Sequence, residues 1–193
     1  MMADAPRRER LARTVPRRLR PIEHRAKRAC AIGFQPAPLL GRLTFSETFG
    51  YLFERHREDL VKYLTDTFGV AKIRHSLGLP ENHCWLAFVD DLPVGIAKLL
   101  YPSDPPRLPK PRAAQLQKIY VLRDYLAQGI GVPLLQAACD RAAVLDVGTI
   151  WLTVLAENAR AIRFYERHGF VTLGQTTFAI GAQTFDFDVL RKA

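Results

Sequence analysis

An amide and a phenol lie seven residues apart in the C-terminal part of this 193-residue chain, at Asn158 and Tyr165. Seven residues make about two turns of an α-helix, so a helix here would place both side chains on one side. A phenol with a pKa of about 10 is protonated at neutral pH and can donate its proton to a leaving group. Tyr165 is therefore a candidate general acid. The alternative is a core tyrosine whose hydroxyl is satisfied inside the protein.

A glycine-bearing loop, Gly129-Ile130-Gly131, is the second candidate for chemistry. It follows an apolar, strand-like segment and precedes a helical pattern. Glycine permits close approach and unusual backbone torsions, and the amides at a helix N-terminus attract a phosphate. Such a loop alone often only turns the chain. It gains weight here because the Asn158–Tyr165 segment follows it after one predicted helix and one predicted strand.

The two motifs together resemble those of the GCN5-related N-acetyltransferase (GNAT) superfamily. The pattern N-x-x-A-x-x-F-Y-x-x-x-G-F is matched by Asn158, Ala161, Phe164, Tyr165, Gly169 and Phe170. The resemblance covers roughly residues 46–191. A looser similarity, at residues 44–49 and 59–64, is to the bacterial polyamine acetyltransferase-like branch. The resemblance implies an acetyl-CoA-dependent N-acetyltransferase, which moves the acetyl group of acetyl-CoA, its co-substrate, directly to a primary amine.

The same resemblance implies which residues bind the co-substrate. They are Ile119, Tyr120 and Val121 for the pantetheine arm and acetyl group, Ala127, Gln128, Gly129, Ile130, Gly131 and Val132 for the pyrophosphate, and Asn158 and Tyr165 beside them. Tyr165 is the implied catalytic acid. A backbone amide in the segment 119–121 would stabilise the oxyanion of the reaction. Leu126 stands where the superfamily usually has Gln or Arg, and Gln128 is expected to replace part of that contact.

The sequence assigns no general base. Several GNAT enzymes carry a Glu at the position of Thr153, which cannot take a proton from an amine. Gln115 stands at another position where relatives often carry an acid, and Glu157, a water chain ending at Glu47 and a main-chain carbonyl stay open. On the predicted first helical region, Glu47, Glu54 and Glu58 fall on one stripe that either attracts a cationic amine or only solvates the helix.

The elements that must position these residues follow from hydrophobic periodicity. Helices are predicted at residues 45–68 (broken near 54–57), 70–77, 131–147 and 159–168, and strands at 83–89, 94–101, 115–122, 150–155, 170–180 and 182–190. In the third of these strands, alternation predicts Leu116, Lys118 and Tyr120 on one face. The resemblance implies an α/β GNAT fold, a mixed, mostly antiparallel sheet that is splayed in the middle and flanked by helices.

The net charge of +9 is concentrated at the N-terminus, since residues 1–42 hold 11 of the 28 basic and 3 of the 19 acidic residues. We expect residues 1–40 to form a poorly ordered basic arm, and residues 41–193 to form the GNAT domain. A targeting peptide and a nucleic-acid-binding arm are the alternatives. Because the remaining residues are almost neutral, we expect no nucleic-acid partner. A non-catalytic CoA-binding regulatory module and a protein N-acetyltransferase are the rival functions.

The amino-acid composition limits the predictions about membranes, disulfides and metal sites. No run of about 18 apolar residues occurs, so no membrane partner is expected. Cys30, Cys84 and Cys139 are far apart, which favours neither a disulfide framework nor a zinc site. We therefore expect a cytoplasmic enzyme without a metal, whose partner is an amine substrate. A homodimer is left open.

Overall fold

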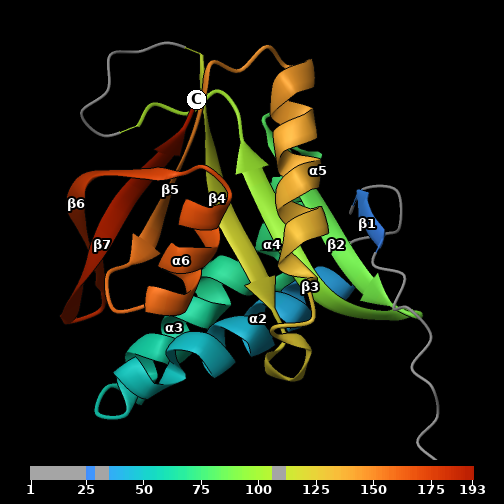
Figure 1. Ribbon diagram of the computed structural model, residues 1–193. Coiled ribbons are helices and arrows are strands. Elements are labelled where there is room, and N and C mark those ends of the chain that lie inside the picture. The colour runs from blue at the N-terminus through green and yellow to red at the C-terminus, as the bar shows by residue number, and fades with distance from the viewer. Residues whose placement is uncertain (1–24, 29–34, 106–111) are drawn as a thin grey trace, which may run out of the picture.

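The protein contains one mixed sheet with helices on both faces (Figure 1). The computed structural model describes residues 25–28, 35–105 and 112–193. The strand order in the described sheet is β1-β2-β3-β4-β5-β7-β6, and every neighbouring pair is antiparallel except β4 and β5. The predicted fold class, an α/β sheet that is mostly antiparallel and flanked by helices, is confirmed.

The elements have the following bounds. The strands are β1 (Arg25–Arg28), β2 (Asn82–Val89), β3 (Leu92–Leu100), β4 (Ala113–Val121), β5 (Thr149–Leu155), β6 (Val171–Ile180) and β7 (Gln183–Lys192). The helices are α2 (Pro36–Phe49), α3 (Arg57–Phe68), α4 (Val70–Gly78), α5 (Gly131–Val144) and α6 (Ala159–Arg167), with short 3-10 turns η1 (Gly50–Phe53) and η2 (Arg123–Tyr125). None of the helices in the described ranges is long and apolar enough to cross a membrane.

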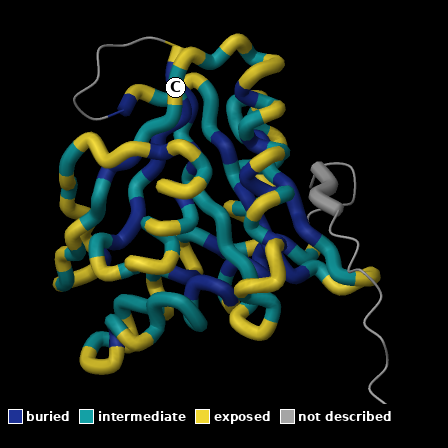
Figure 2. Tube along the Cα trace, in the orientation of Figure 1, coloured by how far each residue is buried: buried dark blue, intermediate teal, exposed yellow. Residues whose placement is uncertain are grey.

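Two apolar layers hold the helices to the sheet. One face packs against α5 and α6, where Leu134, Leu135 and Ala138 meet the strands and Tyr165 joins the same cluster. The other face packs against α2, whose Ala37 and Leu40 contact Leu86 and Ile96. In Figure 2 the buried stretches run along the central strands, between the two helical layers. The sheet is thus covered on both faces near its middle.

The sheet opens between β4 and β5. These parallel strands pair only at Ala113–Thr149, Ala114–Ile150 and Gln115–Trp151, after which they diverge. Beyond that point β4 still pairs with β3, and β5 still pairs with β7. The divergence leaves main-chain groups on the facing edges without a strand partner, as the predicted splay requires.

A β-bulge at Gln117 corrects one prediction about β4. Lys98 pairs with Lys118, but the next residue of β3, Leu99, pairs with Leu116, so Gln117 is an extra residue. An inserted residue reverses the alternation of side chains. Leu116 therefore packs in the α5 cluster, whereas Lys118 and Tyr120 face the α2–α3 side. The predicted common face of all three residues is wrong for Leu116.

The N-terminal region also differs from the expected boundary at residue 40. Helix α2 begins at Pro36, and residues 25–28 form a strand antiparallel to β2. Prolines fit the first turn of a helix because its amides need no partner there, so Pro36 and Pro38 start the helix instead of breaking it. Most of the predicted arm lies outside the described residues, so the arm stays a prediction.

Candidate active site

A cavity of about 1000 Å³ occupies the gap between the diverging strands β4 and β5. Its walls come from β4, β5, the loop 125–132, the N-terminal part of α5 and helix α6. Further side chains from α2, η1, α3, β6 and β7 line the same space, and we call these the acceptor end. A volume of this size suits a ligand of nucleotide dimensions together with a second small molecule.

The loop before α5 is shaped for close backbone approach. Ala127 has φ of 62° and Gly129 has φ of 81°, and both line the cavity, as do Ile130, Gly131 and Val132. The first amides of α5 have no partner within the helix, and they carry the positive end of its dipole. This arrangement is suited to an anionic diphosphate.

Two residues of this loop bear on the side-chain contact expected with the co-substrate. Leu126 lines the cavity with an apolar side chain. The side chain of Gln128 instead donates to the carbonyl of Asp124 at 2.8 Å, is exposed, and is not among the cavity-lining residues. The Gln128 side chain is thus directed at Asp124, and its expected contact with the co-substrate stays a prediction.

Helix α6 positions the side-chain amide of Asn158 and the phenol of Tyr165. The Asn158 side chain accepts a hydrogen bond from the Ala161 amide at 3.1 Å, so it caps the helix as its residue type predicts. Gly169, with φ of 85°, ends the helix. Asn158 and Tyr165 both line the cavity, which confirms that they share one side.

Tyr165 is buried yet its hydroxyl has no hydrogen-bond partner among the described residues. Its ring packs edge-on against Phe164 and Phe170, with centroid distances of 5.3 and 5.5 Å. Burial raises the pKa of Tyr165 well above the usual value, so the phenol keeps its proton at all neutral and mildly alkaline pH values. It can therefore act as a donor in this cavity.

The edge of β4 supplies main-chain groups to the same space. Ile119, Tyr120 and Val121 all line the cavity, and their backbone pairs with β3 on the other side. Every second residue of such an edge directs its amide or carbonyl away from β3. The Tyr120 side chain packs near Phe45 and Phe49, at 6.4 and 6.2 Å between ring centroids. Burial, followed by the nearby phenols of Tyr63 and Tyr165, raises the pKa of Tyr120.

Gln115 and Thr153, at the two positions where relatives carry an acid, line the cavity, but neither side chain can take a proton from an amine. The Glu47 carboxylate instead accepts the backbone amide of Arg123 at 2.9 Å, and Glu157 is exposed. No Asp or Glu is found among the cavity-lining residues in the part of the chain that the structure describes. The acidic stripe of the first helical region therefore does not line the cavity.

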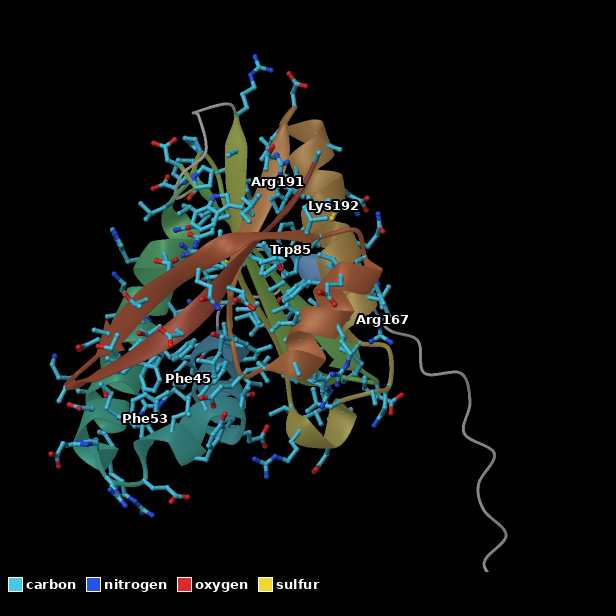
Figure 3. The ribbon with its side chains drawn as sticks, turned by 60° about the vertical axis from the view of Figure 1, so that its left-hand side comes forward. Phe45, Phe53, Trp85, Arg167, Arg191 and Lys192 are labelled. Carbon is cyan, nitrogen blue, oxygen red and sulfur yellow. The ribbon has the colours of Figure 1, made fainter. Side chains whose placement is uncertain are left out.

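Sequence reasoning missed three cationic side chains that line the cavity: Lys118 from β4, and Arg160 and Arg167 from α6. Burial, and then the neighbouring Lys98, lowers the pKa of Lys118 to about 8. Lys118 is predicted as a strand residue on the same face as Leu116, but the bulge at Gln117 places it on the opposite face, which α2 and α3 cover. Figure 3 shows Arg167 on α6, apart from Phe45 and Phe53 at the helical end below the β6–β7 hairpin.

The cavity residues fit acetyl-CoA. The strand edge can pair with the pantetheine amides, the loop and the start of α5 match a diphosphate, and the lining carries cations without acids. The described residues contain no group of three or more His, Cys, Asp or Glu placed to hold a metal ion. Neither Cys84 nor Cys139 lines the cavity. The lining residues in the described ranges therefore include no thiol that could serve as an acyl-carrying nucleophile.

The sequence matches the model of the family described as "Acetyltransferase (GNAT) family" over residues 46–170. It is 25% identical over 154 residues to an uncharacterized N-acetyltransferase of Lactobacillus delbrueckii subsp. lactis, a match covering 80% of this chain and 88% of that protein. It is 30% identical over 125 residues to an uncharacterized N-acetyltransferase of Mycobacterium tuberculosis, covering 65% of this chain and 76% of that protein.

The fold is also similar to solved structures. The PaiA N-acetyltransferase from Thermoplasma acidophilum, crystallised with coenzyme A, superposes with a TM-score of 0.66 at 16% sequence identity. The match covers 89% of this chain and 99% of that one. At this identity the likeness concerns the fold.

Proposed function

Since this chain belongs to the acetyltransferase (GNAT) family, we propose that it transfers acetyl from acetyl-CoA to a small primary amine by direct attack, with Tyr165 as the general acid. The protein is an acetyl-CoA-dependent N-acetyltransferase. Its acceptor, its catalytic residues and its co-substrate contacts are the subject of the proposal. The single observation that carries it is the unpartnered phenol of Tyr165 inside the cavity between β4 and β5.

The co-substrate would be held in two places. The amides of Gly129, Ile130 and Gly131, at and just before the start of α5, would bind the diphosphate, whereas the Val132 amide donates to the Gly129 carbonyl at 3.1 Å and only lines the loop. The edge of β4 at residues 119–121 pairs with the pantetheine arm, and an amide of this edge donates to the thioester oxygen. Asn158 fixes the first turn of α6 and lies on the same wall. Arg160 and Arg167 add positive charge to that side.

The chemistry then depends on proton transfer. Bound acetyl-CoA supplies an activated thioester, whose carbonyl carbon the amine attacks. Tyr165 donates its proton to the departing sulfur, and its raised pKa keeps that proton available. No carboxylate among the described lining residues can serve as the base, so the amine must enter neutral or lose its proton to water.

The test is thiol release from acetyl-CoA across a panel of amines, for the wild type and Tyr165→Phe. General acid catalysis contributes roughly 10²- to 10⁴-fold. We expect kcat to fall by roughly 10² or more while the Kd for CoA, measured by calorimetry, stays unchanged. Tyr51→Phe is the matched control, because Tyr51 is exposed on η1. Wild-type turnover in Tyr165→Phe would refute the role of the phenol.

The same measurements discriminate the rival function. Tight CoA binding without turnover of any amine would indicate the non-catalytic CoA-binding module. The absence of CoA binding would remove the whole proposal.

The acceptor proposal is narrower than the expectation from sequence. A polyamine carries several positive charges and needs acidic partners, and no acid lines the cavity in the described residues. We therefore favour a small amine other than a polyamine. A protein N-terminus needs an open path for a polypeptide chain. The hydrogen bond between Asp59 of α3 and Ala182 holds α3 to the β6–β7 turn, two residues after the lining residue Ile180, and this connection favours a small molecule.

A further inference from the structure

The acceptor end of the cavity has an aromatic lining. Six of its side chains are Phe45, Phe49, Phe53, Tyr63, Phe185 and Phe187. Their rings contact one another, with centroid distances of 4.7 Å for Phe45–Tyr63, 4.8 Å for Phe45–Phe49 and 5.4 Å for Phe53–Phe185. Tilted and edge-on arrangements of this kind are favourable for aromatic rings. Phe45 and Phe53 are buried beneath this lining, whereas the other four rings are partly exposed and could contact a flat apolar group.

The charge at this end is positive. Lys118 lines the cavity from β4, on the sheet face that α2 and α3 cover. Its ammonium lies 5.5 Å from the centroid of the Phe68 ring, and none of the described carboxylates forms an ion pair with it. Its partner in the β3 register is a second cation, Lys98.

The acids of α2 and α3 are placed elsewhere. Glu47 accepts from the backbone of Arg123, Asp59 accepts from the amide of Ala182, and Asp66 pairs with Lys62 on the outer face of α3. Glu54 and Glu58 are exposed. The side chains that would attract a cationic substrate are thus absent from the described lining, which includes Lys118 instead.

The charged state of Lys118 suits an anionic partner. Its pKa of about 8 results first from burial, then from Lys98, with the Cys84 thiol acting in the opposite direction. At neutral pH the ammonium therefore stays mostly protonated. A carboxylate beside it would favour the protonated form further.

Resting on the acetyltransferase function proposed above, we propose that the acceptor is a small aromatic amine that carries a carboxylate, such as an aromatic amino acid. Its ring would lie beside the partly exposed rings of Phe49, Tyr63 and Phe185, and its carboxylate would pair with Lys118. Its amino group is then left to face the β4 edge and Tyr165.

The test compares four acceptors. Phenylalanine has both a ring and a carboxylate, phenylalaninamide and 2-phenylethylamine keep the ring without the carboxylate, and spermidine is an aliphatic polyamine. Wild-type enzyme should show the highest kcat/KM with phenylalanine. Lys118→Met removes the charge and keeps a long, apolar side chain. It should raise the KM for phenylalanine at least 10-fold while changing the KM for 2-phenylethylamine less than 3-fold. Lys118→Arg should restore most of the preference.

Lys62→Met is the control, because Lys62 is an exposed lysine whose ammonium pairs with Asp66 on α3. It should leave all four acceptors unchanged. Spermidine as the best acceptor, or an equal effect of Lys118→Met on phenylalanine and 2-phenylethylamine, would overturn the proposal. In both cases turnover would still support the acetyltransferase function.

A binding measurement separates the two proposals when turnover fails. N-acetylphenylalanine, the expected product, is titrated by calorimetry into the protein saturated with CoA. Binding that is lost in Lys118→Met supports the acceptor class even if Tyr165 proves not to be the acid. CoA binding without any N-acetylphenylalanine binding would reject the acceptor class alone.

Discussion

The carboxylate of Asp59 accepts the backbone amide of Ala182 at 3.1 Å, joining α3 to the turn between β6 and β7. The turn residue before it, Gly181, has φ of 59°, and a Cβ there would collide with the Asp59 carboxyl group. Only glycine therefore allows the turn to approach α3 this closely. Ile180, which directly precedes this turn, lines the acceptor end, so the contact holds a segment next to the cavity lining.

Asp59→Ala should loosen this segment without affecting CoA. A single hydrogen bond contributes about 0.5–1.5 kcal/mol, so we expect the KM for the acceptor to rise several-fold and the Kd for CoA to stay constant. Steady-state kinetics and calorimetry measure the two quantities. Asp66→Ala on the exposed side of the same helix is the control. A larger effect on CoA than on the acceptor would contradict this assignment.

Asn158→Ala should destabilise α6 by about 1 kcal/mol, because the cap to the Ala161 amide is lost. Asn158→Asp should retain stability, since a carboxylate also caps and its charge is favourable at a helix N-terminus. Urea unfolding measures both variants. If Asn158→Ala is as stable as the wild type, the side chain has no capping role.

Substitutions at Ala127 and Gly129, the two positive-φ residues of the loop 125–132, should change stability in opposite directions. Ala127→Gly relieves a left-handed backbone, which costs an L-residue about 1–2 kcal/mol, and we expect equal or higher stability. Gly129→Ala introduces that strain, although its Cβ would meet no atom within 4 Å. We expect weaker CoA binding in Gly129→Ala only. Unfolding curves and calorimetry check both, and a tight-binding Gly129→Ala would show that the torsion is not needed.

Alkaline pH should destabilise the fold through its buried phenols. Burial raises the pKa values of Tyr63, Tyr120 and Tyr165, so the folded state prefers the protonated phenol. Their contribution is fully present below the unfolded pKa of about 10 and is lost as pH rises through the folded values. The Tm measured from pH 8 to 11 should fall less steeply in Tyr165→Phe. Identical slopes would place the Tyr165 phenol in water.

The KM for phenylalanine should rise as pH passes about 8, where Lys118 loses its proton. The groups acting on this ammonium are Lys98 of β3, which lowers its pKa, and Cys84 of β2, which raises it. The phenols of Tyr63 and Tyr120, on the same side, stay protonated in this range because burial raises their pKa values. The KM for 2-phenylethylamine should not show this rise, and Lys118→Met should abolish it.

The parts of the site that were predicted from sequence are local in the chain. Asn158 caps α6 and Gly169 ends it through contacts within a few residues, and the glycines at 129 and 131 shape a single turn. These features depend on residue type and short spacing. They are therefore visible without knowledge of the tertiary structure.

The missed parts depend on distant partners. The bulge at Gln117 arises from pairing with β3, so alternation within β4 could not show that Lys118 enters the cavity. The start of α2 was missed because Pro36 and Pro38 resemble helix breakers when their position in the first turn is unknown. The acceptor end combines α2, α3, β6 and β7, which only the fold brings together.

The β6–β7 hairpin lies in residues 171–193, beyond the segment 46–170 that matches the family. It supplies Ile180, Phe185 and Phe187 to the cavity, whereas the loop 125–132 and Tyr165 belong to the matched segment. Replacing this C-terminal hairpin with one of different sequence should therefore change which amine is acetylated. It should leave the residues proposed to bind and cleave the thioester unchanged.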